Sequence, residues 1–169
     1  LCEPFLPTEV CPKTLENLGE KALNGTIKGP FSAHPHTVPS RQAQYNFGVH
    51  YGRKTTLELY ELPNQGAAKN LGTIDLPFAP FLHDFMATQN HLIFFLPPVH
   101  LSIFSFLSGT RTLADSMRWK PKQATQVLIV PIEDPSQHTW LEMETSFLWH
   151  FANAYERGSE IVVGWVRYK

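Results

Sequence analysis

Fourteen prolines are spread along the 169 residues, and they limit the kinds of element that this chain can form. Proline has no backbone N–H and its ring clashes with the preceding turn, so it interrupts a helix wherever it falls in the interior. Few windows are left for a helix of three turns, and the best of them is a short one near 103–114. The chain is therefore predicted to be all-β with little helix.

Aromatic and β-branched runs mark the expected strands. They cover 44–51, 55–62, 69–76, 82–88, 91–96, 126–132, 139–144, 146–151 and 160–168. Turn residues separate many of them, and Gln89-Asn90 is predicted to close a tight hairpin between two of the runs. Strands at such regular intervals are typical of antiparallel meanders in a sandwich, a barrel or a propeller. No repeat of fixed period appears, so the pattern alone leaves these three open.

Composition excludes several classes of function. Fourteen basic and 15 acidic residues give a net charge of −1, which argues against a nucleic-acid binder because phosphate contacts need a basic surplus. Two cysteines do not make a disulfide scaffold. No Walker loop, dinucleotide fingerprint or Gly-x-Ser-x-Gly element is present.

The most hydrophobic stretch, 91–107, is too short and too interrupted to span a membrane. It is broken by Pro97 and Pro98 and carries His100, whereas a spanning helix needs about 20 nearly continuous apolar residues. We expect an interior strand followed by a hydrophobic surface loop. No signal peptide opens the chain, so we expect a cytoplasmic or plastid-like location.

Three of the eight histidines stand among large apolar neighbours, where an imidazole needs a hydrogen-bond partner or a metal. They are His34, His83 and His150. Taken singly, each could be a satisfied core residue, and spacings of 49 and 67 residues do not by themselves specify a site. His36 could share an ion with His34 on a strand, but no carboxylate follows within a few residues, as cupin-type sites require, so it is disfavoured as a ligand.

Several motifs together closely resemble the carotenoid cleavage oxygenase family, which includes apocarotenoid oxygenases, lignostilbene dioxygenases and the retinal pigment epithelium isomerase. They are FSAHPH at 31–36, FLHDF at 81–85, LIFFLPP at 92–98, WKPKQATQVLIV at 119–130 and HFANAYE at 150–156. The opening of the chain, 1–19, is also similar, so the resemblance extends over essentially all 169 residues as one domain with no second domain.

The resemblance implies a seven-bladed β-propeller, of which this chain would form about three blades. It implies one non-haem Fe(II) held by four histidines, with His34, His83 and His150 as the first three ligands. Glu3 matches the first of three glutamates that accept a hydrogen bond from a liganding imidazole, here that of His83. The fourth histidine and the other two glutamates would lie beyond Lys169.

The implied activity is oxidative cleavage of a conjugated C=C bond in a carotenoid, apocarotenoid or stilbene, with O2 as co-substrate. Such substrates partition into lipid, so the 91–107 region could also belong to a surface that touches the membrane peripherally. Two other hypotheses stay open: an inactive remnant or apocarotenoid-binding β protein of the same descent, and a zinc hydrolase built on three histidines. The chain lacks an initiator Met and ends within a strand-like run, which indicates a piece of a longer protein, and 1–169 alone is predicted to be inactive.

Overall fold

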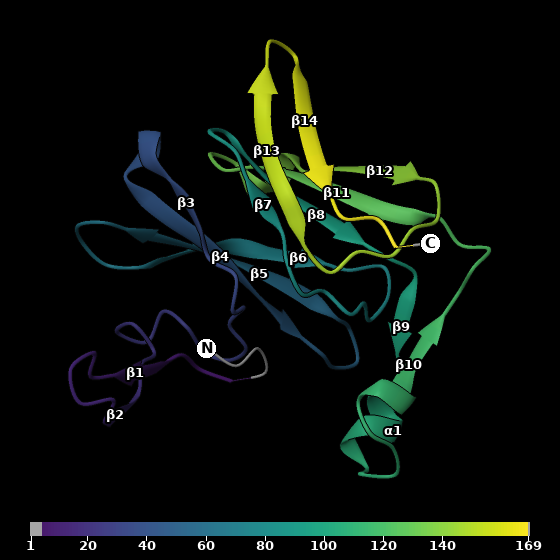
Figure 1. The fold of residues 1–169 in the computed structure, drawn as a ribbon, viewed down its shortest axis with the longest axis horizontal. Helices are drawn as coiled ribbons and strands as arrows, with labels where there is room; N and C mark the ends of the chain where they lie inside the picture. Colours follow the sequence, from purple (N-terminus) through teal and green to yellow (C-terminus); the bar gives the residue numbers. More distant parts are fainter. Residues whose placement is uncertain (1–4, 169) are drawn as a thin grey trace.

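The structure is a computed structural model, and it describes residues 5–168 apart from the side chains of Phe106 and Leu107. Antiparallel β-sheet dominates the described residues (Figure 1). The helical segments there are short: α1 (Ile103–Leu107), η1 (Pro39–Arg41), η2 (Ala114–Ser116) and η3 (Pro135–Gln137). The expected all-β class is confirmed.

Two four-stranded meanders form the body of the molecule. The first runs β3 (His36–Val38), β4 (Ala43–His50), β5 (Thr56–Pro63) and β6 (Lys69–Asp75) in spatial order. The second has the order β7 (Met86–Ala87), β8 (His91–Leu96), β11 (Thr125–Pro131) and β12 (Thr139–Met143). A third pair, β13 (Phe151–Arg157) and β14 (Glu160–Trp165), follows them in the chain.

The first strands of these three sheets lie next to one another. β3 contacts β7, and β7 contacts β13, so the first strands of the three sheets meet. The remaining strands of each sheet follow in order away from its first strand. Radial repetition of antiparallel meanders is the arrangement of a propeller. The chain therefore forms part of a β-propeller, as the resemblance implied.

Two smaller sheets lie outside the blades. β1 (Thr8–Val10) pairs with β2 (Asn17–Glu20) near the start of the described chain. β9 (Val99–Leu101) pairs with β10 (Met117–Trp119), and together with α1 they form an arm inserted between β8 and β11 (Figure 1). Of these five short elements, only the helix was expected from the sequence; the four strands were not.

The continuous apolar run of β8 is explained by burial on both of its faces. Leu92, Phe94 and Leu96 point into the core shared with the first meander. Ile93 and Phe95 point into the core shared with the β13–β14 pair. Because side chains alternate along a strand, a strand between two cores must be apolar at every position. The expected interior strand is confirmed.

Three expected elements were wrong in extent. The 103–114 helix ends at Leu107, because Gly109 adopts φ +67, a left-handed conformation that helices do not continue through. The 82–88 strand shrinks to Met86–Ala87, although the hairpin at Gln89-Asn90 is present.

The 146–151 strand is absent up to Phe151. Thr125 explains this, since its hydroxyl donates to the carbonyl of Ser146 and accepts from the backbone N–H of Ser146, each at 3.0 Å. A side chain thus satisfies backbone groups that a sheet partner would otherwise take. The segment therefore follows an irregular path, and His150 lies directly before β13.

Candidate metal centre

The three histidines singled out in the sequence all precede the first strand of a sheet. His34 lies two residues before β3, His83 three residues before β7 and His150 directly before β13. Because these inner strands are neighbours, residues 49 and 67 positions apart arrive at one place. The propeller topology, rather than any local spacing, brings the histidines together.

Their ring nitrogens converge on a single point. The Nε2 atoms of His34 and His83 are 3.0 Å apart, and those of His83 and His150 are 3.2 Å apart. One nitrogen from each ring lies within 4.8 Å of both others. Imidazole nitrogens about 2.1 Å from one ion, at right angles, would be about 3 Å apart. The cluster therefore has the spacing of a metal site.

Aromatic side chains surround the middle histidine. Phe81 lies parallel to the His83 ring with centroids 6.3 Å apart, and Trp149 meets the same ring edge-on at 5.4 Å. His34 and His83 are partly buried, whereas His150 is exposed. These aromatic side chains pack against the ring of His83 and restrict its orientation.

The segment before His34 is fixed to strand β4 by close backbone contact. The N–H of Ser32 donates to the carbonyl of Phe47 at 2.8 Å, and the Asn46 amide donates to the carbonyl of Ser32 at 2.9 Å. At Gly48 an added Cβ would stand 2.0 Å from the carbonyl oxygen of Pro30, so only glycine permits this approach. The Ser32 hydroxyl also accepts from the N–H of His34 at 3.1 Å.

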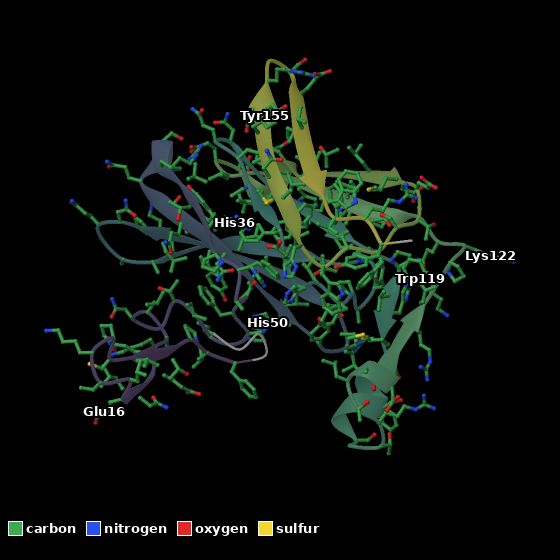
Figure 2. The ribbon with its side chains drawn as sticks, viewed as in Figure 1. Glu16, His36, His50, Trp119, Lys122 and Tyr155 are labelled. Atoms are coloured by element: carbon green, nitrogen blue, oxygen red, sulfur yellow. The ribbon has the colours of Figure 1, made fainter. Side chains whose placement is uncertain are left out.

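His36 lies near the middle of the molecule (Figure 2), but its ring contacts a carboxylate rather than the cluster. Its Nε2 lies 3.2 Å from Oδ1 of Asp84, a side chain that is only 6% exposed. Burial opposes ionisation of this carboxyl. Hydrogen bonds from His36 and from the N–H groups of Phe151 and Phe85 outweigh burial, so the pKa of Asp84 lies below its ordinary value. Asp84 is therefore held as a carboxylate.

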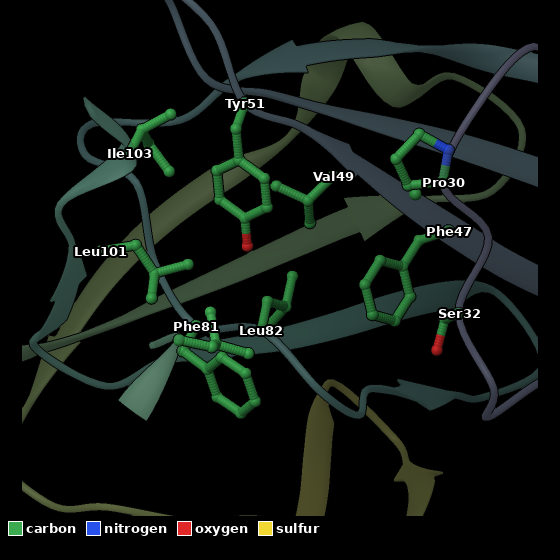
Figure 3. A pocket seen from close by; sticks show the side chains of 11 residues that line it. Pro30, Ser32, Phe47, Val49, Tyr51, Phe81, Leu82, Leu101 and Ile103 are labelled. Carbon is green, nitrogen blue, oxygen red and sulfur yellow. The ribbon is translucent and has the colours of Figure 1, made fainter. Parts of the chain in front are cut away.

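An apolar cavity of about 170 Å³ lies beside the centre, between strand β4 and the base of the arm (Figure 3). Phe81 and Leu82 belong to its wall, immediately before His83 in the chain. Phe47, Val49, Tyr51 and Leu101 line other sides, with the Tyr51 hydroxyl donating to the carbonyl of Pro80 at 2.8 Å. Such a lining favours a hydrophobic ligand.

Sequence reasoning missed the cavity and did not single out Asp84. The cavity combines residues from five separate stretches of chain, which no local pattern connects. For Asp84 a signal did exist, since it directly follows His83, but two of its partners, His36 and Phe151, are 48 and 67 residues away in the sequence. Glu3 lies outside the described residues, so its predicted hydrogen bond with His83 stays a prediction.

Comparisons with known proteins agree on one family. The family model described as retinal pigment epithelial membrane protein matches residues 1–169. Apocarotenoid-15,15'-oxygenase of Synechocystis is 28% identical, with 99% of this chain and 36% of that protein covered. Isoeugenol monooxygenase of Pseudomonas nitroreducens is 27% identical over 95% of this chain and 34% of that protein.

Solved structures show the same relationship. Cobalt-substituted Synechocystis ACO superposes with a TM-score of 0.89 at 26% identity, covering 99% of this chain and 36% of that one. A mutant of the same protein gives 0.86 at 29% identity, covering 96% and 36% of the two chains. The chain thus spans about a third of the length of these relatives. Its matched sequence and fold place it in the retinal pigment epithelial membrane protein family, the family of the carotenoid cleavage oxygenases.

Proposed function

We propose that His34, His83 and His150 together hold one Fe(II) ion. We propose that the complete protein uses this ion with O2 to cleave a conjugated C=C bond in a carotenoid, apocarotenoid or stilbene. The observation that carries the proposal is the convergence of three imidazole nitrogens from three separate segments. Relatives named as an apocarotenoid oxygenase and a carotenoid cleavage dioxygenase support the reaction class.

The donor set fits the ion. Imidazole is a good ligand for iron, and three neutral rings leave the full positive charge on the metal. When bound, iron supplies the O2 chemistry, and the protein supplies binding and orientation. Phe81 and Trp149 pack on His83 and fix its ring, so the ligand needs little rearrangement to bind the metal.

The neighbouring cavity supports an apolar, conjugated substrate. Phe81 and Leu82 border both the cavity and His83, so a flat molecule lying there would approach the metal centre past aromatic surface. Its wall is mostly apolar and offers no charged group that would favour a polar ligand. We propose that the cavity forms part of the path by which the substrate reaches the metal centre.

We also propose peripheral membrane contact through the arm. Phe104 on α1 is 86% exposed, and the adjacent Ile103 lines the cavity. A substrate dissolved in lipid could thus enter the cavity directly from a membrane surface. Within residues 5–168 no helix has the length and apolar character needed to cross a bilayer.

Residues 1–169 are proposed to be one part of a single propeller domain. The fourth histidine and two further glutamates that the family resemblance implies would come from outside these residues, so 1–169 alone would lack activity. A protein containing the chain without them would instead correspond to the inactive or apocarotenoid-binding alternative.

The test uses the intact protein expressed with iron. We expect close to one iron per molecule, O2 uptake and two carbonyl products from a conjugated substrate. His83→Ala should lose most of the iron and the activity, whereas His138→Ala, which changes a histidine that hydrogen-bonds to the carbonyl of Pro135 at 2.9 Å, should lose neither.

Three outcomes would contradict the proposal. Zinc in place of iron, with hydrolysis and no O2 uptake, would favour the hydrolase. Apocarotenoid binding without turnover would favour the binding protein. Unchanged iron content in His83→Ala would show that the cluster is not the metal site.

A further inference from the structure

We infer that Asp84 is a positioning residue that fixes the three histidine-bearing segments relative to one another. The inference rests on the proposed metal centre and adds to it a residue that touches none of the three converging nitrogens. It follows from which groups the buried carboxylate binds.

Both oxygens of Asp84 are engaged. Oδ1 accepts from the N–H of Phe85 at 2.9 Å and lies 3.2 Å from Nε2 of His36. Oδ2 accepts from the N–H of Phe151 at 3.0 Å. With the side chain only 6% exposed, these contacts replace nearly all of the hydration that the carboxylate would have in water.

Each contact lies close in sequence to one of the converging histidines. His36 stands two residues after His34, Asp84 one residue after His83, and Phe151 one residue after His150. A residue in extended chain advances about 3.3 Å, so each tie lies within about 7 Å, measured along the backbone, of a converging histidine. One carboxylate thus connects the entrances to β3, β7 and β13.

Glu156 offers a matched comparison within the same part of the fold. It also ties the second meander to β13, accepting from the N–H of Asn90 at 2.9 Å and contacting Nδ1 of His91 at 3.0 Å. Glu156 lies six residues beyond His150 in the sequence, near the other end of β13. Both carboxylates hold blades together, but only Asp84 acts beside the histidines.

The experiment compares Asp84→Asn with Glu156→Gln in the intact protein, using Co(II) as the probe. In either orientation the Asn amide sets its NH₂ group against a backbone N–H, that of Phe85 or that of Phe151. We measure the Co(II) dissociation constant, the visible absorption bands that report the geometry of bound cobalt, and the thermal unfolding temperature.

We expect Asp84→Asn to weaken Co(II) binding by roughly tenfold or more and to alter the cobalt bands. Glu156→Gln should lower the unfolding temperature but keep the dissociation constant within about twofold and the bands unchanged. Equal effects of the two variants on cobalt would overturn the inference and leave Asp84 as an ordinary stabilising residue. Failure of the unaltered protein to bind Co(II) would overturn the metal centre, and the inference with it.

A second pair covers the case in which Asp84→Asn does not fold. His36→Gln keeps a donor for Oδ1, whereas His36→Leu removes it. The inference requires weaker Co(II) binding in His36→Leu and restoration towards the original value in His36→Gln. Identical affinities in the two variants would contradict it.

Discussion

Single carboxylates join segments that are distant in the sequence. Glu156 on β13 accepts hydrogen bonds from Thr88, Asn90 and His91 at the β7–β8 hairpin. Burial opposes its ionisation, but these donors outweigh burial and hold the pKa of Glu156 at about 2, below its ordinary value of 4.5. A carboxyl group with a lowered pKa in the folded state stabilises that state only while it is ionised.

The stabilisation by Glu156 should therefore depend on pH. It should be complete above about pH 5 and decline as the pH falls towards 2, because the unfolded chain then takes up the proton first. Glu156→Gln should cost about 2 kcal/mol of unfolding free energy at pH 7, since the side chain is only 21% exposed, and less than half of that at pH 3. Denaturant titrations at the two pH values measure this difference.

Glu160→Gln is the control for that measurement. Glu160 pairs with Arg157 at 2.9 Å, but both side chains are more than 60% exposed, so the pair should contribute little. A Glu156→Gln effect that stays constant between pH 7 and pH 3 would show that ionisation of Glu156 is not what stabilises the fold.

Packing between elements depends on a few close approaches. Strand β4 and the segment that leads to His34 approach so closely that Gly48 has no room for a side chain, with Pro30 on the opposite side. Such contact restricts the backbone path of the segment. The segment therefore has a defined path although it belongs to no sheet.

Gly48→Ala should destabilise the protein by about 1–3 kcal/mol, because the backbone must shift to admit the methyl group. Gly52→Ala is the matched control, since its added Cβ would meet only the carbonyl oxygen of Lys54 at 3.4 Å. Thermal unfolding of both variants tests this, and equal stability would disprove the close approach.

The arm exposes a large aromatic side chain, Phe104, on α1. Replacing the exposed Phe104 by Asp should reduce binding to lipid vesicles several-fold without changing the unfolding temperature, because the side chain packs against little else. Leu141→Asp, at an equally apolar position that is 49% exposed on β12, should leave vesicle binding unchanged. Sedimentation with vesicles measures both, and equal loss would exclude a specific role for α1.

Some elements were predictable from local pattern and others were not. The run 91–96 identifies β8 because burial on both faces leaves an unmistakable apolar signature. The run 146–151 resembles a strand equally well, yet Thr125 and the core around Leu148 hold it in an irregular path. The outcome there depends on a contact 21 residues away, which no local window contains.

Over the whole molecule, the proposed metal would act as a cross-link. His34, His83 and His150 precede strands in three different sheets, so an ion bound to all of them holds the blades together at their inner edges. Any ligand that binds only the folded state raises its stability by mass action.

Removal of the metal should therefore lower the unfolding temperature of the intact protein. Free metal at a thousand times its dissociation constant would contribute about 4 kcal/mol. Scanning calorimetry with and without a chelator should show a shift of several degrees, and His83→Ala should show none. A shift of the same size in His83→Ala would place the stabilising metal elsewhere.

The sequence by itself determined the β class and the interior strand β8, because these depend on residue type and on period, and its family motifs singled out His34, His83 and His150. Only the tertiary structure decided that the histidines meet, that Asp84 connects their segments and that a cavity lies beside them. The reason is physical: each of these features joins side chains from separate strands, and their distances depend on how the sheets pack rather than on any spacing along the chain.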